Sequence, residues 1–219
     1  MAETFEKPKK FTEEWIKYIW HYYKWHIIGT VFVILSVISF VYGKITATQP
    51  DLRVAMAGNI VIQPENEDKF QLMLNEKVTD INGDGKTEVF RPMFYIFYQS
   101  TEMGADYQFA MSQKLSLELT SQETFLFIFH DNIVRQYMGA PDAAFLKTEK
   151  WAENISDDLL LKDEYGRAYG VSLKNSTMLK ECGIDGSDMY VLIRAITNHE
   201  ENRDVLYQES IRIAKEIIK

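Results

Sequence analysis

The chain has 219 residues and a formal net charge of −8, from 32 acidic and 24 basic side chains. The first 26 residues hold five Lys and four Glu, so their charge is about +1 and the rest of the chain carries about −9. This acidic balance argues against nucleic acid as a partner, because nucleic acid binds through Lys and Arg that neutralise phosphates. Cys182 stands alone in the sequence, which excludes an intrachain disulfide, a Cys-rich zinc site and a CxxC redox pair.

The chain begins with a polar tail, residues 1–14, that we expect to lie in the cytoplasm. Thr12 stands before Glu13 and Glu14, and this order predicts a helix start. A Thr side chain caps free backbone amides, and acidic side chains favour the first turn of a helix. The helix that follows is predicted over residues 15–43, as a juxtamembrane part rich in aromatic side chains and a transmembrane part.

Residues 25–42, from Trp25 to Tyr42, contain no charged side chain. A helix of this length rises about 27 Å, close to the hydrocarbon thickness of a bilayer. Aromatic side chains flank the run, as they do at the headgroup level of membranes. The pattern predicts one transmembrane helix, retained as a signal anchor. A buried core helix and a cleaved signal peptide remain alternatives, although Ile45 makes cleavage after Ala47 unfavourable.

Basic side chains gather before the apolar run. Five lysines precede it, whereas only Lys44 and Arg53 lie in the next stretch of similar length. The positive-inside rule therefore predicts a cytoplasmic N-terminus and an extracytoplasmic main domain, in a single-pass protein of the cell membrane. One cysteine in a domain of this size fits a bacterial surface better than an oxidising eukaryotic exterior.

Residues 44–50 are predicted to form a short connector, and residues 51–219 form a single predicted extracytoplasmic domain. Its first half alternates strand and helix patterns. The predicted strands are 51–58, 89–98 and 124–129, and the predicted helices between them are 66–78 and 106–119. Pro92 indicates an edge position or an irregularity in the second strand. The third strand is apolar on both faces, which is typical of a buried central strand.

The second half of the domain has weaker patterns. We expect short helical pieces at 133–138 and 142–146, a mixed segment at 151–161, strands at 168–173 and 189–196, a helical turn at 176–181 and a closing helix at 201–218. Strands that alternate with helices are typical of parallel sheets with crossover connections. The predicted fold class is α/β, with an N-terminal transmembrane helix followed by one open, mostly parallel sheet flanked by helices.

The loop after the first predicted helix of the domain resembles a calcium-binding loop. Five of its residues fit positions 1, 3, 5, 6 and 9 of the calcium loop that begins D-x-[DN]-x-[DN]-G: Asp80, Asn82, Asp84, Gly85 and Glu88. Arg91 stands where the pattern places a bidentate Glu, and its positive charge has the wrong sign for a cation site. Two interpretations stay open, a turn built from Asx and Gly residues and a weak calcium site with one ligand supplied from elsewhere.

His130, Asp131 and Asn132 follow the predicted buried strand directly. Open α/β sheets place ligands at the carboxyl ends of their strands, so these residues are the candidate ligand-binding group. A His bonded to backbone at a strand end is the alternative. The sequence lacks HExxH, GxSxG, P-loop and GxGxxG motifs, so no catalytic signature is present.

Residues 111–130 combine a helix pattern with Lys-Leu-x-x-Glu-Leu, a short polar turn and a buried aromatic and aliphatic strand. Together with Gly170-Val-Ser-Leu173 and the segment 183–192, this resembles part of bacterial extracellular solute-binding proteins. It looks most like single-lobe, membrane-anchored relatives from Gram-positive bacteria. The resemblance implies an α/β lobe whose sheet is flanked by helices.

The resemblance has limits in this sequence. Ser121-Gln122-Glu123 stands where the family has a Gly-containing turn. About 175 residues after the span supply little more than one lobe, whereas a solute-binding protein closes two lobes on its ligand. A span replaces the lipidated Cys as the anchor, and no ligand-binding motif of the family has a counterpart here.

Three functions follow from these patterns. The first is a non-catalytic, membrane-anchored binding module for a small molecule, a peptide or a protein partner. The second is a structural or accessory subunit of a membrane complex, such as a transporter, contacted through the aromatic helix. The third is an enzyme that uses His130 and Asp131. We expect no cofactor apart from possible calcium at the Asp80 loop.

Overall fold

The computed structural model describes residues 11–46, 50–60, 62–95, 104–121, 123–137, 145–196 and 201–219. The chain divides into two compact units, Met1–Thr48 and Gln49–Lys219. The division falls within the predicted connector.

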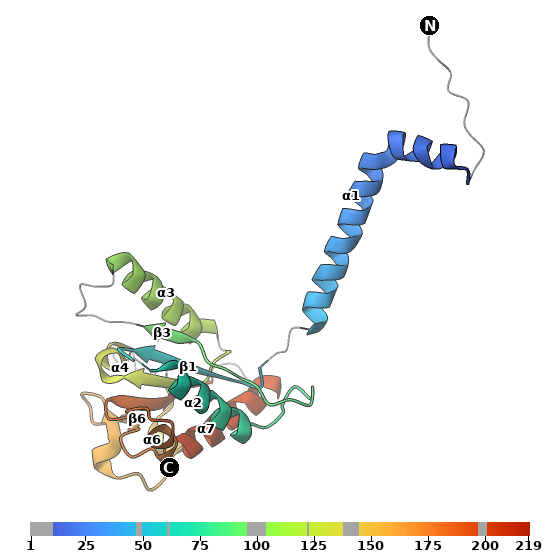
Figure 1. The fold of residues 1–219 in the computed structure, drawn as a ribbon. Helices are drawn as coiled ribbons and strands as arrows, with labels where there is room; N and C mark the ends of the chain where they lie inside the picture. The colour runs from blue at the N-terminus through green and yellow to red at the C-terminus, as the bar shows by residue number, and fades with distance from the viewer. Residues whose placement is uncertain are drawn as a thin grey trace. The chain divides into compact units, whose positions relative to one another are not determined.

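The described part of the first unit contains the helix α1, Glu13–Thr46, drawn in blue in Figure 1. The Oγ1 atom of Thr12 accepts the backbone N–H of Trp15 at 3.3 Å, so the predicted cap is confirmed. The segment Trp15–Tyr42 is long and apolar enough to cross a membrane. The helix continues to Thr46 and so includes the first residues of the predicted connector.

The second unit is built on a sheet, whose strands in the described part of the chain follow the order β2-β1-β4-β7-β6-β5, with β3 also beside β1. These strands are β1 Leu52–Gly58, β2 Val89–Phe90, β3 Met93–Tyr95, β4 Leu126–His130, β5 Leu160–Lys162, β6 Ala168–Ser172 and β7 Met189–Ile193. Pro92 separates β2 from β3, which is the irregularity expected there, and its carbonyl accepts the N–H of Met56. The predicted residues 96–98 of that strand lie outside the described residues.

The sheet is mixed, and the prediction of a mostly parallel sheet is wrong. β1 pairs in parallel with β2, β3 and β4, whereas β4 with β7, β7 with β6 and β6 with β5 are antiparallel. The loop between β5 and β6 is a short hairpin, in which Asp163 accepts N–H groups of Tyr165 and Arg167. Such a short loop can join only antiparallel strands.

Helices cover both faces of the sheet. Those in the described part of the chain are α2 Pro64–Lys77, α3 Ala105–Ser121, α4 Asp131–Tyr137, α6 Thr177–Glu181 and α7 Glu201–Ile217, with short 3-10 helices at Thr148–Lys150 and Asp157–Leu159. Residues 142–144 of the predicted helical piece 142–146 lie outside the described residues, and Phe145 forms a bridge with Arg194 instead. Figure 1 shows α3 on one side of the sheet and α2, α6 and α7 on the other.

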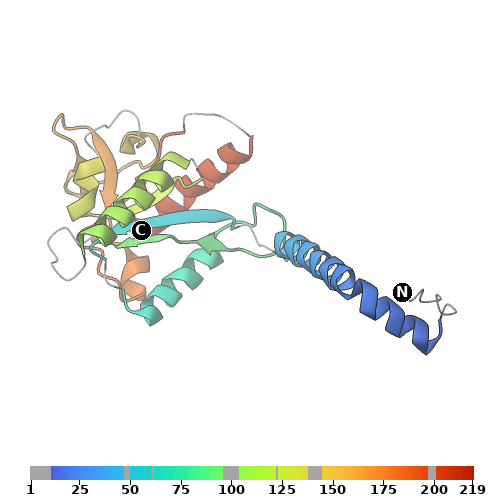
Figure 2. The ribbon, with the colours of Figure 1, turned by 90° about the horizontal axis from the view of Figure 1, so that it is seen from above.

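Each face of the sheet has its own hydrophobic core. Successive side chains of a strand point to opposite faces, so β4 sends Leu126 and Ile128 into one core and Phe127 and Phe129 into the other. We call the first the α7-side core, because α2, α6 and α7 pack there, and the second the α3-side core, because α3 and α4 pack there. Figure 2 shows the same ribbon from above, with β1 drawn in cyan. The two-faced burial of β4 is what its continuous apolar run predicts.

Candidate functional site

Two neighbouring strands of the sheet end at the same edge. β1 and β4 pair in parallel, and each is followed by a helix. α2, which follows β1, buries Phe70 in the α7-side core, whereas α4, which follows β4, buries Ile133 in the α3-side core. The chain therefore leaves the two strands toward opposite faces. In open α/β sheets this arrangement opens a crevice at the carboxyl ends of the strands, where ligands bind.

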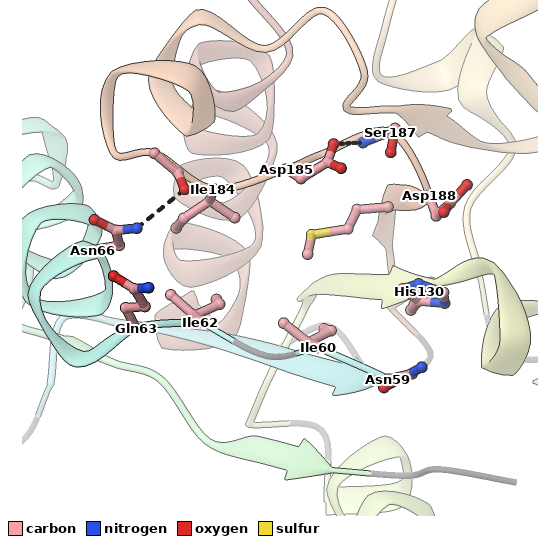
Figure 3. A pocket seen from close by; sticks show the side chains of 12 residues that line it. Asn59, Ile60, Ile62, Gln63, Asn66, His130, Ile184, Asp185, Ser187 and Asp188 are labelled. Atoms are coloured by element: carbon pink, nitrogen blue, oxygen red, sulfur yellow. Dashed lines mark hydrogen bonds between the residues drawn. The ribbon is translucent and has the colours of Figure 1, made fainter. Parts of the chain in front are cut away.

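A cavity of about 520 Å³ lies at this edge. Its lining comes from four segments: the stretch after β1, the first turn of α2, the end of β4 and the loop before β7. The lining residues are Asn59, Ile60, Ile62, Gln63, Asn66, His130, Gly183, Ile184, Asp185, Ser187, Asp188 and Met189. Figure 3 shows the stretch after β1 on one side of the cavity and the loop with Asp185 and Asp188 on the other. The volume suits a small organic ligand.

Glycine at position 58 allows the ends of β1 and β4 to approach each other. A Cβ added to Gly58 would lie 2.4 Å from the Cβ of His130 and 3.0 Å from Oδ1 of Asn132. The φ angle of Gly58 is +134°, a backbone conformation that residues with a side chain rarely adopt. His130 thus sits beside the β1 backbone, with its ring at the cavity.

The three residues predicted as a ligand-binding group differ in their position relative to the cavity. His130 lines the cavity. Its Nδ1 accepts the backbone N–H of Asn132 at 3.3 Å, which in the neutral imidazole leaves the proton on Nε2. The Oδ1 atom of Asn132 accepts the N–H of Asn59 at 3.4 Å, so Asn132 holds the lining residue Asn59 in place.

Asp131 belongs to α4 and not to the cavity lining. Its carboxylate accepts a hydrogen bond from Arg135 at 3.0 Å, one helical turn later. Its backbone N–H donates to the carbonyl of Asp188 at 2.8 Å, which joins the end of β4 to the loop before β7. Asp131 therefore shapes the site through its backbone, and ligand contacts by the side chains of Asp131 and Asn132 stay predictions.

The loop before β7 supplies lining residues that the sequence reasoning missed. Oδ1 of Asp185 accepts the N–H of Ser187 at 2.9 Å. Hydrogen bonds from the Ser187 backbone and hydroxyl lower the pKa of Asp185, so its carboxylate is charged at neutral pH. Nδ2 of Asn66 donates to the Gly183 carbonyl at 3.1 Å and ties this loop to α2. The sequence did carry a signal, because Asp, Gly, Ser and Asp directly precede the strand at residue 189.

The Asp80 loop is closed by its own backbone. The two carboxylate oxygens of Asp80 accept the N–H groups of Gly83 and Gly85, at 2.7 and 2.9 Å. Asn82 accepts from the N–H of Asp84 at 2.8 Å. This bonding satisfies a turn of Asx and Gly residues without a metal. Within the described residues, no group of three His, Cys, Asp or Glu side chains converges as metal ligands, and the calcium site at Asp80, Asn82, Asp84 and Glu88 stays a prediction.

Asp51 is the residue that holds the Asp80 loop against the sheet, and sequence reasoning assigned it no role. Its side chain is 1% exposed. Oδ1 accepts the N–H groups of Ile81 and Asn82, and Oδ2 accepts that of Glu88, at distances of 2.8, 3.2 and 2.9 Å. The one signal in the sequence was a carboxylate at the very start of an apolar strand.

No protein-family model and no curated protein matches this sequence. Imidazole, amide, hydroxyl and carboxylate groups converge at the cavity on an apolar base. This combination suits reversible binding of a small polar ligand, because a few polar groups orient a ligand whose remaining surface packs on apolar side chains.

Proposed function

We propose that the protein is a single-pass, membrane-anchored binding module whose extracytoplasmic α/β domain holds a small ligand in the cavity at the ends of β1 and β4. The function is recognition without catalysis. The observation that carries the proposal is the cavity itself, which opens where two parallel strands send their chains to opposite faces.

The contacts of His130 and Asp131 support binding over catalysis, because each residue is bonded to a group other than its neighbour. The Nδ1 atom of His130 is bonded to the N–H of Asn132, whereas the carboxylate of Asp131 is bonded to Arg135. A histidine that acts as a general base needs a substrate proton within reach of one ring nitrogen and an orienting hydrogen bond on the other. If any turnover is found, His130→Ala in the folded protein decides the enzymatic alternative, since unchanged turnover removes His130 as a catalytic group.

A screen of the full-length protein in lipid nanodiscs tests the binding proposal. Sugars, short peptides, amines and carboxylates are added singly, and the unfolding temperature is recorded. A ligand at a hundred times its Kd stabilises the folded state by about 2.7 kcal/mol. The stabilisation should disappear in His130→Ala and persist in His21→Ala, whose exposed imidazole lies on α1. The absence of any stabilising compound would contradict the proposal.

We further propose that the N-terminus is cytoplasmic and the α/β domain lies outside the cell. The lysines before the apolar run support this orientation. Cys182 is buried, so an added surface cysteine can be labelled selectively. A membrane-impermeant maleimide should label Tyr165→Cys, on the exposed β5–β6 hairpin, in intact cells. Glu13→Cys should react only after permeabilisation, and the reverse result would invert the topology.

A second candidate function is supported by α1. Trp20, Tyr23 and Trp25 are 56%, 50% and 74% exposed on this helix. Aromatic surfaces of this kind contact lipid headgroups or a partner helix. The protein would then be an accessory subunit of a membrane complex. Replacing residues 15–42 with an unrelated span of equal length tests this reading, because equal recovery of a partner with both chains excludes the helix as the contact.

A further inference from the structure

The charged side chains among the described residues that line the cavity are carboxylates. Asp185 and Asp188 contribute two carboxylates from the loop before β7. Asn66 uses its Nδ2 atom to reach the Gly183 carbonyl, which leaves its Oδ1 atom as an acceptor. Carboxylates and amide oxygens call for donors on the ligand, and a charged donor gives the strongest hydrogen bonds with them.

No basic side chain other than the imidazole of His130 is among the described residues that line the cavity. Two basic side chains on the surrounding elements point to other partners. Lys69, on α2, donates to the carbonyl of Glu181. Arg135, on α4, pairs with Asp131 at 3.0 Å. Neither cation is bonded to Asp185 or Asp188, so the two aspartates give the lining a negative charge, which disfavours anionic ligands.

The base of the cavity is apolar. Ile60, Ile184 and Met189 are 2%, 5% and 5% exposed, and each belongs to the α7-side core as well as to the lining. Figure 3 shows Ile60 and Ile62 along one wall, with Asp185 and Asp188 across from them. A ligand with a short aliphatic body and a positive group would place the body against the isoleucines and the positive group near the aspartates.

We infer that the ligand is a small organic cation, with an amino or guanidinium group on a short aliphatic chain. This inference rests on the proposed binding function and names the ligand class for the same cavity. The ammonium or guanidinium group contacts Asp188 and Asp185, and the chain packs on Ile60, Ile184 and Met189. Asp188 is the better residue to alter, because Asp185 also closes the turn at Ser187.

The test uses full-length protein in nanodiscs of zwitterionic lipid, which does not attract cations as anionic lipid does. Isothermal titration calorimetry compares putrescine, agmatine and n-butylamine with neutral 1,4-butanediol and anionic succinate. The cations should bind at least about tenfold more tightly than the diol, a difference of 1.4 kcal/mol. Asp188→Asn should also lower the affinity for the cations by about tenfold.

The matched control is Glu76→Gln, which removes the same charge from the exposed far end of α2. Affinity within about twofold of the unaltered protein is expected for this control, since a screened surface charge contributes little. An equal loss in both variants would mean that net charge alone attracts the cations, and the inference would fail.

The remaining outcomes separate this inference from the proposed function. Binding of the diol or of succinate that depends on His130, with no binding of the cations, would overturn the ligand class and leave the binding function standing. Failure of all these probes, together with a flat response in the wider screen, would overturn both. Cation binding that is unchanged in Asp188→Asn would place the cation elsewhere and contradict the assignment.

Discussion

Gly58 at the end of β1 lies directly against His130 at the end of β4. A Cβ on Gly58 would be 2.4 Å from the Cβ of His130, a distance that real Cβ atoms do not adopt. The contact joins two strands that are far apart in the sequence and places the imidazole at the cavity. The geometry of the site therefore depends on a missing side chain.

Gly58→Ala should destabilise the α/β domain and displace His130. Overpacking of this kind costs about 1–3 kcal/mol, and the positive φ adds backbone strain. Gly166→Ala is the matched control, because Gly166 also has a positive φ, of +76°, but nothing lies within 4 Å of an added Cβ. Urea unfolding should show the larger loss for Gly58→Ala. Equal losses would mean that strain alone, and not the contact with His130, determines the residue at position 58.

Asp51 predicts a second stability effect at the opposite end of β1. Asp51→Asn keeps one acceptor oxygen but turns an amide NH₂ toward at least one of the three N–H donors that the carboxylate satisfies. An orphaned buried donor costs about 1–3 kcal/mol, so the free energy of unfolding should fall by that amount. Asp84→Asn alters an exposed carboxylate that accepts the backbone N–H of Lys86. This variant should lose about 1 kcal/mol or less of its free energy of unfolding. Similar losses in the two variants would show that burial of Asp51 contributes nothing.

The elements of this fold were largely predictable because their patterns are local. The apolar run of β4, the helix pattern of α7 and the break at Pro92 each depend on a few adjacent residues. The direction of β7 is different. Its residues Met189–Ile193 alternate with the same period in a parallel or an antiparallel strand, and only pairing with β4 and β6 fixes the direction.

The candidate site was only partly predictable for a related reason. His130 could be proposed because it ends a recognisable buried strand. Asn59 and Asp188 reach the same cavity from segments whose proximity depends on the sheet order β1-β4-β7. Asp131 is adjacent to His130 in the sequence, but its carboxylate lies on α4 beside Arg135, so adjacency alone does not show that two side chains share a site.

The calcium prediction at the Asp80 loop can be tested by the response to added metal. Extracellular sites of this type have Kd values of about 0.1–1 mM. Calcium at roughly ten times Kd would stabilise the domain by about 1.4 kcal/mol, or about 3–6 °C for a chain of this size. Asp80→Ala also removes the bonds to Gly83 and Gly85, so the calcium-induced shift, and not the starting temperature, is compared. A shift that is absent in the unaltered protein, or equal in the variant, would exclude the site.

Glu209 on α7 predicts how stability depends on pH. Burial by itself would raise the pKa of its carboxyl, but hydrogen bonds from Arg212 and from the N–H of Thr79 outweigh burial and hold the pKa below its ordinary value of 4.5. Glu209 is 8% exposed. Its carboxylate accepts the backbone N–H of Thr79 at 2.7 Å and the Nε–H of Arg212 at 2.7 Å.

Because the folded state lowers this pKa, the unfolded state binds the proton more readily. The stabilisation by Glu209 is therefore complete above the unfolded pKa and is lost as pH falls from there through the folded pKa. Glu209→Gln should lose roughly 1–3 kcal/mol near neutral pH, as expected for hydrogen bonds to a charged group. Denaturant unfolding of both proteins between about pH 6 and about pH 3 should show the difference shrinking as the unaltered carboxylate becomes protonated. Glu149→Gln, at an exposed position, controls for general acid effects and should track the unaltered protein. A difference that stays constant over the whole range would mean that the charge of Glu209 does not stabilise the contact between α7 and Thr79.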